Sequence, residues 1–351
     1  MKGIVFLGFL PLALAVSCTS GASETPTATP TPSLSSLAQA RGIAIGAAVG
    51  PQFLRDEPAY AETLGREFSM LTPENVMKFG LVHPEPDRYD FADADYLVDF
   101  AEAHGMQVRG HTLVWHFQLP TWLTEGTWTR DELIGILREH ITTVVGHYRG
   151  RVAAWDVVNE AVGDDGSLRD TIWLRGIGPE YIDMAFRWAH EADPDALVFY
   201  NDYAGEGLGA KSDAIYALVQ GLLERGVPIN GVGFQMHVSL RWPPAPEAVA
   251  ANVARLGALG LQVHITEMDV RIQDGTGTVD ERLAAQANIY RDMMDVCLAS
   301  SACKAFVTWG FTDRHSWIPL FTDNPDVPLL FDESYRPKPA YYAIMDALAG
   351  R

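Results

Sequence analysis

The sequence WDVVNE at residues 155–160 decides how the rest of the chain is interpreted. A short apolar run ends in an amide, Asn159, which is followed directly by a carboxylate, Glu160. Buried parallel strands look like this when they deliver reactive groups at their carboxyl ends. Because neighbouring side chains alternate between the faces of a strand, the two residues can share a cleft only if the strand ends or bends between them. We therefore expect Glu160 to begin a loop and to serve as a catalytic acid, which requires a second carboxylate.

Around this stretch, short apolar runs alternate with longer helical patterns from about Ala38 to the end of the chain. The candidate strands are 43–49, 68–71, 107–114, 153–158, 197–201, 231–237, 262–266 and 305–309. The candidate helices are 94–104, 130–148, 179–191, 211–225, 246–259, 280–299 and 339–348. Eight strands separated by helices predict an α/β fold, a closed (β/α)₈ TIM barrel in a single catalytic domain over residues 38–351. An open sheet that binds a dinucleotide is disfavoured, because no glycine-rich turn of the required form follows the first strand.

The composition describes a globular protein and limits its partners. Of the 351 residues, 48% are hydrophobic and 20% are charged, which is ample material for a core. The net charge of −19 argues against nucleic acid as a partner, because phosphates would be repelled. The chain also carries 9 Trp, 12 Tyr and 15 Phe, whose flat apolar surfaces are available for stacking on planar or ring-shaped ligands. Burial of most of them in the core is the alternative.

The amino-terminal residues read as an export signal followed by a tether. Residues 1–18 combine one lysine, an apolar run and small residues, which indicates a signal peptide and not a membrane span. The sequence AVSC at residues 15–18 is similar to a lipoprotein box, which would make Cys18 a lipidation site, and plain secretion is the alternative. Residues 19–37 are rich in Thr, Pro and Ser and predict an extended tether. The protein is thus expected outside the cell, touching a membrane only through a lipid at Cys18.

Two of the three cysteines lie close together in the sequence. In an exported protein, Cys297 and Cys303 are expected to form a small local disulfide that fixes one loop. Two buried free thiols are the alternative.

The ends of the other predicted strands supply the second carboxylate. In a barrel the reactive groups lie at the carboxyl ends of the strands. Ile265 and Glu267 share a strand face, which places Glu267 at the inner rim, whereas His264 has the opposite parity and is interpreted as structural. A glycosidic bond could lie between Glu160 and Glu267, because its hydrolysis needs one carboxylic acid and one carboxylate.

Several motifs now match a family in order along the chain. They are TPEN and Lys78 in residues 72–78, GHTLVWH at 110–116, WDVVNEA at 155–161, YNDY at 200–203, GVGFQMH at 231–237, ITEMD at 265–269, WG with Asp313 and SW in 309–317, and PKPAY at 337–341. Together they resemble the family 10 glycoside hydrolases, chiefly endo-β-1,4-xylanases, over roughly residues 38–351. The resemblance implies a TIM barrel that cleaves with retention through a covalent glycosyl-enzyme intermediate.

The resemblance also implies roles for individual residues. Glu160 would be the acid/base and Glu267 the nucleophile, with Asn159 bonding the sugar 2-hydroxyl and His237 keeping the nucleophile ionised. Asp269 would support His237, with a surface role as the alternative. The glycone subsites would be lined by Glu74, Asn75, Lys78, His111, Trp115, Gln235, Trp309 and Trp317, and Tyr203 would offer a ring on the leaving-group side. Retention requires the two catalytic carboxyls to lie about 5–5.5 Å apart, and about 6.5–9.5 Å would indicate inversion.

Three positions depart from the family pattern: Phe79, Phe117 and Ala204 stand where Trp, Ser and Asn are common. None removes a catalytic group, but Phe117 and Ala204 are expected near the cleft, where they could alter the leaving-side preference.

The expected partners are xylan and xylo-oligosaccharides, bound by a monomer. The chemistry requires no metal and no organic cofactor, and a structural calcium is left open. Two other functions remain in view: a glycan-binding lipoprotein without activity, and a retaining glycosidase acting on another β-1,4-glucan.

Overall fold

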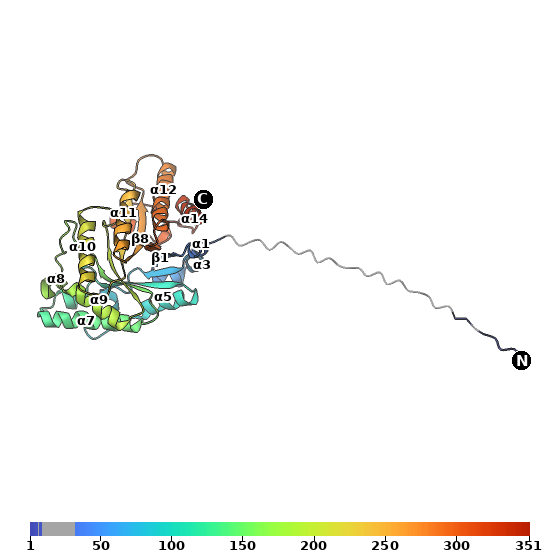
Figure 1. Ribbon diagram of the computed structural model, residues 1–351, viewed down its shortest axis with the longest axis horizontal. Coiled ribbons are helices and arrows are strands. Elements are labelled where there is room, and N and C mark those ends of the chain that lie inside the picture. Colours follow the sequence, from blue (N-terminus) through green and yellow to red (C-terminus); the bar gives the residue numbers. More distant parts are fainter. Residues whose placement is uncertain (6, 9–31) are drawn as a thin grey trace. The chain divides into compact units, whose positions relative to one another are not determined.

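The computed structural model describes residues 1–5, 7–8 and 32–351 (Figure 1). Residues 32–351 form one compact unit. Its first helix, α1 (Leu34–Ala40), buries Leu34, whose backbone N–H donates to Glu67 Oε2 at 3.1 Å. Residues 34–37, assigned to the tether from their composition, therefore belong to the folded unit. Cys18 and most of the predicted signal and tether lie outside the described residues.

Eight parallel strands close into a barrel, which confirms the predicted (β/α)₈ fold. They are β1 (Ala44–Val49), β2 (Met70–Pro73), β3 (Gln107–Val114), β4 (Ala154–Asn159), β5 (Leu197–Asp202), β6 (Gly231–Phe234), β8 (Gln262–Arg271) and β9 (Cys303–Thr308). Each strand pairs with its neighbours in this order, and β9 pairs with β1 to complete the ring. The carboxyl ends of all eight strands therefore meet at one mouth of the barrel.

Helices surround the strands on the outside (Figure 1). The predicted helices are present within two residues of their expected bounds: α5 (Ala92–Ala103), α7 (Arg130–His147), α9 (Tyr181–Ala192), α10 (Ala210–Glu224), α11 (Pro246–Ala258), α12 (Val279–Leu298) and α14 (Pro339–Ala349). Those without a prediction are α1, α2 (Pro51–Asp56), α3 (Pro58–Glu67), α4 (Phe79–Val82), α6 (Thr121–Thr124), α8 (Ile172–Ile177), η1 (Asp313–His315) and α13 (Ile318–Thr322). Most of these are too short to show an amphipathic period.

The sixth predicted strand is interrupted, which the sequence did not indicate. The expected strand 231–237 divides into β6 and a short strand β7 (His237–Ser239), which pairs with the outer half of β8. Met236 lies between them with φ +65°, a left-handed conformation that a residue with a Cβ rarely adopts. Gln235 lies in the break, and His237 begins β7.

The disulfide between Cys297 and Cys303 is present, which confirms that prediction. It joins the end of α12 to the beginning of β9, with a Cα–Cα distance of 5.1 Å. The turn between α12 and β9 is therefore covalently fixed.

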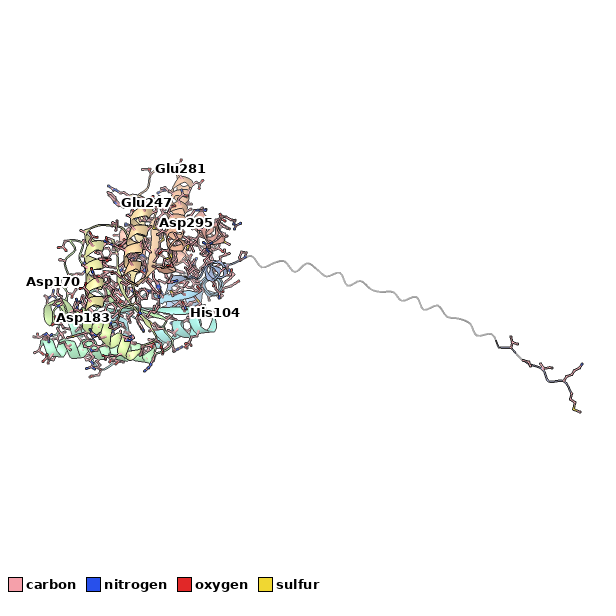
Figure 2. The ribbon with its side chains drawn as sticks, in the orientation of Figure 1. His104, Asp170, Asp183, Glu247, Glu281 and Asp295 are labelled. Carbon is pink, nitrogen blue, oxygen red and sulfur yellow. A yellow bond between two sulfur atoms is a disulfide. The ribbon has the colours of Figure 1, made fainter. Side chains whose placement is uncertain are left out.

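Several acidic side chains lie on the outer surface of the helices. Figure 2 shows Asp183, Glu247, Glu281 and Asp295 on the outside of the barrel, in keeping with the net charge of −19. Within residues 1–5, 7–8 and 32–351, no helix is both long and apolar enough to cross a membrane.

Candidate active site

Glu160 begins the loop after β4, which confirms the expected end of the strand. The strand ends at Asn159, and Glu160 adopts the left-handed region with φ +57°. This backbone is held from two sides: the Glu160 N–H donates to the carbonyl of Asn201 at 2.9 Å, and Arg169 Nε donates to the Glu160 carbonyl at 3.0 Å. The turn allows Asn159 and Glu160 to face the same cleft although they are neighbours in the chain.

The Glu160 carboxyl receives hydrogen bonds from amides. Its Oε1 accepts from Asn159 Nδ2 at 3.2 Å and from Gln235 Nε2 at 3.0 Å. The second oxygen lies 4.0 Å from Nδ1 of His116, and burial lowers the pKa of that histidine although Glu160 opposes the shift. Amide donors can bond either the protonated or the ionised carboxyl, as an acid/base needs.

Glu267, within β8, has more positive surroundings than Glu160. Its Oε1 accepts from Asn201 Nδ2 at 2.7 Å, and its Oε2 accepts from His237 Nε2 at 3.3 Å. His111 Nδ1 lies 3.9 Å from Oε1. Burial alone would raise the pKa of Glu267, but the imidazoles of His111 and His237 outweigh it and lower the pKa below its ordinary value of 4.5. The carboxylate is therefore held ionised, as a nucleophile requires.

His237 is held in its charged form by a second carboxylate. Its Nδ1 donates to Asp269 Oδ2 at 2.8 Å. Burial would lower the pKa of His237, but Asp269 and Glu267 together raise it to about 10. Asp269 is fully buried and also accepts a hydrogen bond from Trp317 Nε1 at 2.8 Å, so the surface alternative for Asp269 is wrong.

Asn201 links the two carboxylates, and the sequence assigned it no role. Its Nδ2 donates to Glu267 Oε1 and, at 2.8 Å, to Asn159 Oδ1, while Asn159 in turn donates to Glu160. The signal was present in the motif YNDY at 200–203, where an amide stands at a strand end as it does in WDVVNE.

Lys78, Trp115 and Trp309 form one wall of the site. Lys78 Nζ lies 5.1 Å and 5.7 Å from the ring centroids of Trp115 and Trp309, and it donates to Asn75 Oδ1 at 2.8 Å. Asn75 Nδ2 in turn donates to Glu74 Oε1 at 3.3 Å. Burial lowers the pKa of Lys78 and raises that of Glu74, although the two charges partly offset these shifts. The wall thus combines stacking surfaces with donors and acceptors suited to sugar hydroxyls.

His111 joins this wall to a buried ion pair that the sequence did not predict. Its ring packs edge-on against Trp309 at 5.1 Å, and its Nδ1 donates to Asp156 Oδ2 at 3.0 Å. Arg109 forms a bidentate pair with the same carboxylate, and its Nη1 donates to His264 Nδ1 at 2.9 Å. Arg109 and Asp156 are each 1% exposed, so the pair lies inside the barrel, and His264 has the structural role expected.

Tyr203 is connected through Arg169 to the loop of Glu160. Its hydroxyl accepts from Arg169 Nη2 at 3.0 Å, and Arg169 also holds the Glu160 backbone. Of the positions that depart from the family pattern, Phe117 is 62% exposed with its ring 5.7 Å from that of Trp115, and Ala204 is exposed with φ +53°.

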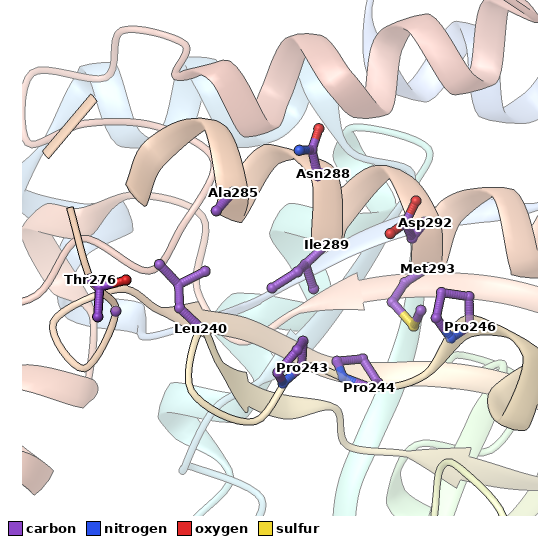
Figure 3. Close-up of a pocket in the computed structure, with 11 residues that line it drawn as sticks. Leu240, Pro243, Pro244, Pro246, Thr276, Ala285, Asn288, Ile289, Asp292 and Met293 are labelled. Atoms are coloured by element: carbon purple, nitrogen blue, oxygen red, sulfur yellow. The ribbon is translucent and has the colours of Figure 1, made fainter. Parts of the chain in front are cut away.

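A separate groove of about 470 Å³ lies between the β7–α11 connection and α12 (Figure 3). Leu240, Pro243, Pro244, Ile289 and Met293 supply most of its apolar lining. The residues lining it include none of the predicted site residues.

Comparison with known proteins shows which family this chain is similar to. The profile described as Glycosyl hydrolase family 10 matches residues 33–347. Endo-1,4-beta-xylanase B of Thermotoga neapolitana is 47% identical over 352 residues, which cover 99% of this chain and 98% of that protein. Beta-1,4-xylanase of Dictyoglomus thermophilum is 43% identical, over 82% of this chain and 84% of its own. The crystal structure of xylanase 10B from Thermotoga petrophila RKU-1 in complex with xylobiose is 50% identical, with a TM-score of 0.89, and the match covers 92% of this chain and 98% of that one.

Proposed function

This chain belongs to glycosyl hydrolase family 10, and we propose that Glu160 is its catalytic acid/base and Glu267 its nucleophile. The protein is a retaining endo-1,4-β-xylanase that hydrolyses β-1,4-xylosidic linkages of xylan. The different surroundings of the two carboxyls carry the assignment: Glu267 lies against two imidazoles that lower its pKa, whereas amides bond the Glu160 carboxyl.

In the first step, Glu160 protonates the glycosidic oxygen while the Glu267 carboxylate attacks the anomeric carbon from the opposite face. The bond to the leaving sugar breaks, and a covalent xylosyl ester with inverted configuration forms on Glu267. In the second step, the ionised Glu160 removes a proton from water, which attacks the same carbon and releases Glu267. The second inversion restores the β configuration. His237 lowers the pKa of the nucleophile, which favours its departure as a carboxylate.

The side chains around the carboxyls would bind the sugar units. Asn159, between the two carboxyls, would bond the 2-hydroxyl of the reacting sugar. Glu74, Asn75, Lys78, His111, Trp115, Gln235, Trp309 and Trp317 would line the glycone subsites, and Tyr203 would stack on the leaving sugar. The contacts of Tyr203 support this division, because they lead through Arg169 to the loop of the acid/base.

Xylan and xylo-oligosaccharides are the substrates, in agreement with the xylobiose complex of a close relative. A preference for another β-1,4-glucan is the weaker alternative. The cluster formed by Glu74, Asn75 and Lys78 argues against it, because this cluster fits the xylose subsite of the family. Activity of the wild type on xylan and on carboxymethylcellulose, compared at equal enzyme concentration, separates the two.

We also propose that the enzyme is an exported monomer, anchored through a lipid on Cys18. The amino-terminal sequence supports the export and the lipid anchor, with its apolar run, the AVSC motif and the Thr/Pro-rich tether of residues 19–37. Mass spectrometry of the membrane fraction should show a diacylated amino-terminal cysteine that is lost in Cys18→Ser. Release of that variant into the medium is the expected companion result.

The catalytic assignment is tested by Glu160→Ala and Glu267→Ala. We expect Glu160→Ala to recover turnover of an aryl β-xylobioside when azide is added, with a β-configured azide product. The Glu267→Ala variant should instead give an α-configured product with azide. Failure of both rescues, or an α-configured first product from xylan with the wild type, contradicts the assignment. A crystal structure should place the two carboxyls about 5–5.5 Å apart.

A further inference from the structure

Lys211 is a buried cation in a place that does not favour one. It is the second residue of α10, and its side chain is only 6% exposed. A positive charge in the first turn of a helix opposes the helix dipole, and lysines are rarely buried unless they are paired. Specific partners must therefore compensate for its position.

The compensation comes from two carboxylates and one aromatic ring. Lys211 Nζ lies 3.0 Å from Asp202 Oδ1, at the end of β5, and 3.3 Å from Asp164 Oδ1, in the loop after β4. The same nitrogen lies 3.4 Å from the centroid of the Tyr203 ring, which is a close cation–π contact. The ammonium therefore occupies one face of this tyrosine.

The edge of the Tyr203 ring is fixed as well. Its hydroxyl donates to Asp164 Oδ1 at 2.8 Å and accepts from Arg169 Nη2 at 3.0 Å. With the hydroxyl held by two charged groups and one face covered by Lys211, the ring has little freedom to turn. The Arg169 Cζ lies farther from the ring, 5.8 Å from its centroid, and Tyr203 is only partly buried, so part of the ring remains accessible to a ligand.

The same contacts tie the ring to the acid/base. Arg169 bonds both the Tyr203 hydroxyl and the Glu160 carbonyl, and Asp202 directly follows Asn201, which accepts from the Glu160 N–H. A sugar stacked on Tyr203 would therefore be placed relative to the group that protonates its oxygen.

We propose that Lys211 is a positioning residue of the leaving-group subsite, whose ammonium covers one face of Tyr203 and so presents the other face to the departing sugar. This inference rests on the proposed role of Tyr203. The charge of Lys211 would then increase the rate of cleavage of substrates that have a sugar as leaving group, in addition to stabilising the fold.

The test compares two substrates in Lys211→Met, which keeps the apolar stem and removes the charge. With xylotetraose, kcat/KM should fall about five- to tenfold, the size expected for loss of one cation–π contact. With 4-nitrophenyl β-xylobioside, which places no sugar on the leaving side, it should change less than twofold. Lys211→Arg, which keeps a cation able to stack on the ring, should retain most of the xylotetraose activity.

A double-mutant cycle with Tyr203→Ala separates this role from a structural one. If Lys211 acts through the ring, Lys211→Met should cost less than twofold in the Tyr203→Ala background. Equal losses on both substrates, or the full loss in that background, would overturn the proposal. The aryl substrate also reports whether each variant has folded. If wild-type enzyme fails to cleave both xylotetraose and xylan, it is the proposed function that fails.

Discussion

Replacing Asp269 by Asn should remove the positive charge that lies against the nucleophile. Asp269 is fully buried, accepts from His237 Nδ1 at 2.8 Å and helps raise the pKa of that histidine to about 10. An asparagine has the same shape but no charge, so the pKa of His237 should fall, because burial lowers it and only Glu267 is left to raise it. The ring could still donate from Nε2 to Glu267, so the variant changes the charge while it can keep the hydrogen bond.

The size of the stabilisation that the charged His237 supplies follows from its pKa. The difference between 6.5 and about 10 corresponds to about 5 kcal/mol in favour of the charged form. This is an upper limit, because 20% of the side chain is exposed and Glu267 supplies part of the effect. Since the pKa is raised in the folded state, the stabilisation is complete below pH 6.5 and is lost as the pH rises through about 10.

Two measurements check this reasoning. Urea unfolding at pH 6.5 and pH 9.5 should show that the wild type exceeds Asp269→Asn in stability by much more at the lower pH. The acid limb of kcat/KM on an aryl xylobioside should move to higher pH, because Glu267 loses the cation that lowers its pKa. Trp317→Phe removes the other hydrogen-bond donor to Asp269 without changing a charge, and it serves as the control. A stability gap that is equal at both pH values, together with an unmoved acid limb, would refute the role of the charge.

Three further changes test separate parts of the structure. Asn201→Ala should lower kcat/KM about 10- to 100-fold, since it removes a hydrogen bond to the ionised nucleophile worth about 1.5–3 kcal/mol; a loss below threefold would contradict this. Asp313→Ala leaves Lys338, whose side chain is 8% exposed, without its carboxylate partner at 2.7 Å. The unfolding free energy, measured in urea at pH 8, should fall by about 3–5 kcal/mol. An effect under 1 kcal/mol would mean that the ion pair is dispensable. The double change Cys297→Ser and Cys303→Ser should cost only about 2–3 kcal/mol, because the closed ring is short; thermal melting with and without reductant checks it, and loss of folding would count against a merely local role.

The sequence was sufficient for the fold and for both carboxylates, because one physical rule connects them. The ends of parallel barrel strands meet at one mouth, so Glu160 after β4 and Glu267 in β8 had to lie near each other once the strands were recognised. Strand parity then separated Glu267 from His264 correctly. These inferences required only the position of each residue within its own strand.

The contacts that escaped prediction depend on relations between strands. Arg109 pairs with Asp156 because β3 and β4 pair in a register that sets His111 opposite Asp156, and a single strand does not reveal that register. The sequence around a charged residue in an apolar run does not show which residue on another strand will pair with it. The left-handed conformation of Met236 is equally hidden, because a methionine, unlike a glycine or an asparagine, does not indicate a turn at its own position.

One hydroxyl fixes the orientation of the amides that serve both carboxyls. Thr266 Oγ1 donates to Asn201 Oδ1 at 2.7 Å, so this oxygen is an acceptor and both hydrogens of Asn201 Nδ2 remain for other partners. They bond Glu267 at 2.7 Å and the oxygen of Asn159 at 2.8 Å. The amide of Asn159 is thereby turned so that its nitrogen donates to Glu160 at 3.2 Å. Each amide has only one workable orientation once the hydroxyl is in place. Because the hydroxyl and both amides lie within strands β8, β5 and β4, the relative placement of nucleophile and acid/base depends on the rigid barrel more than on the loops at its mouth.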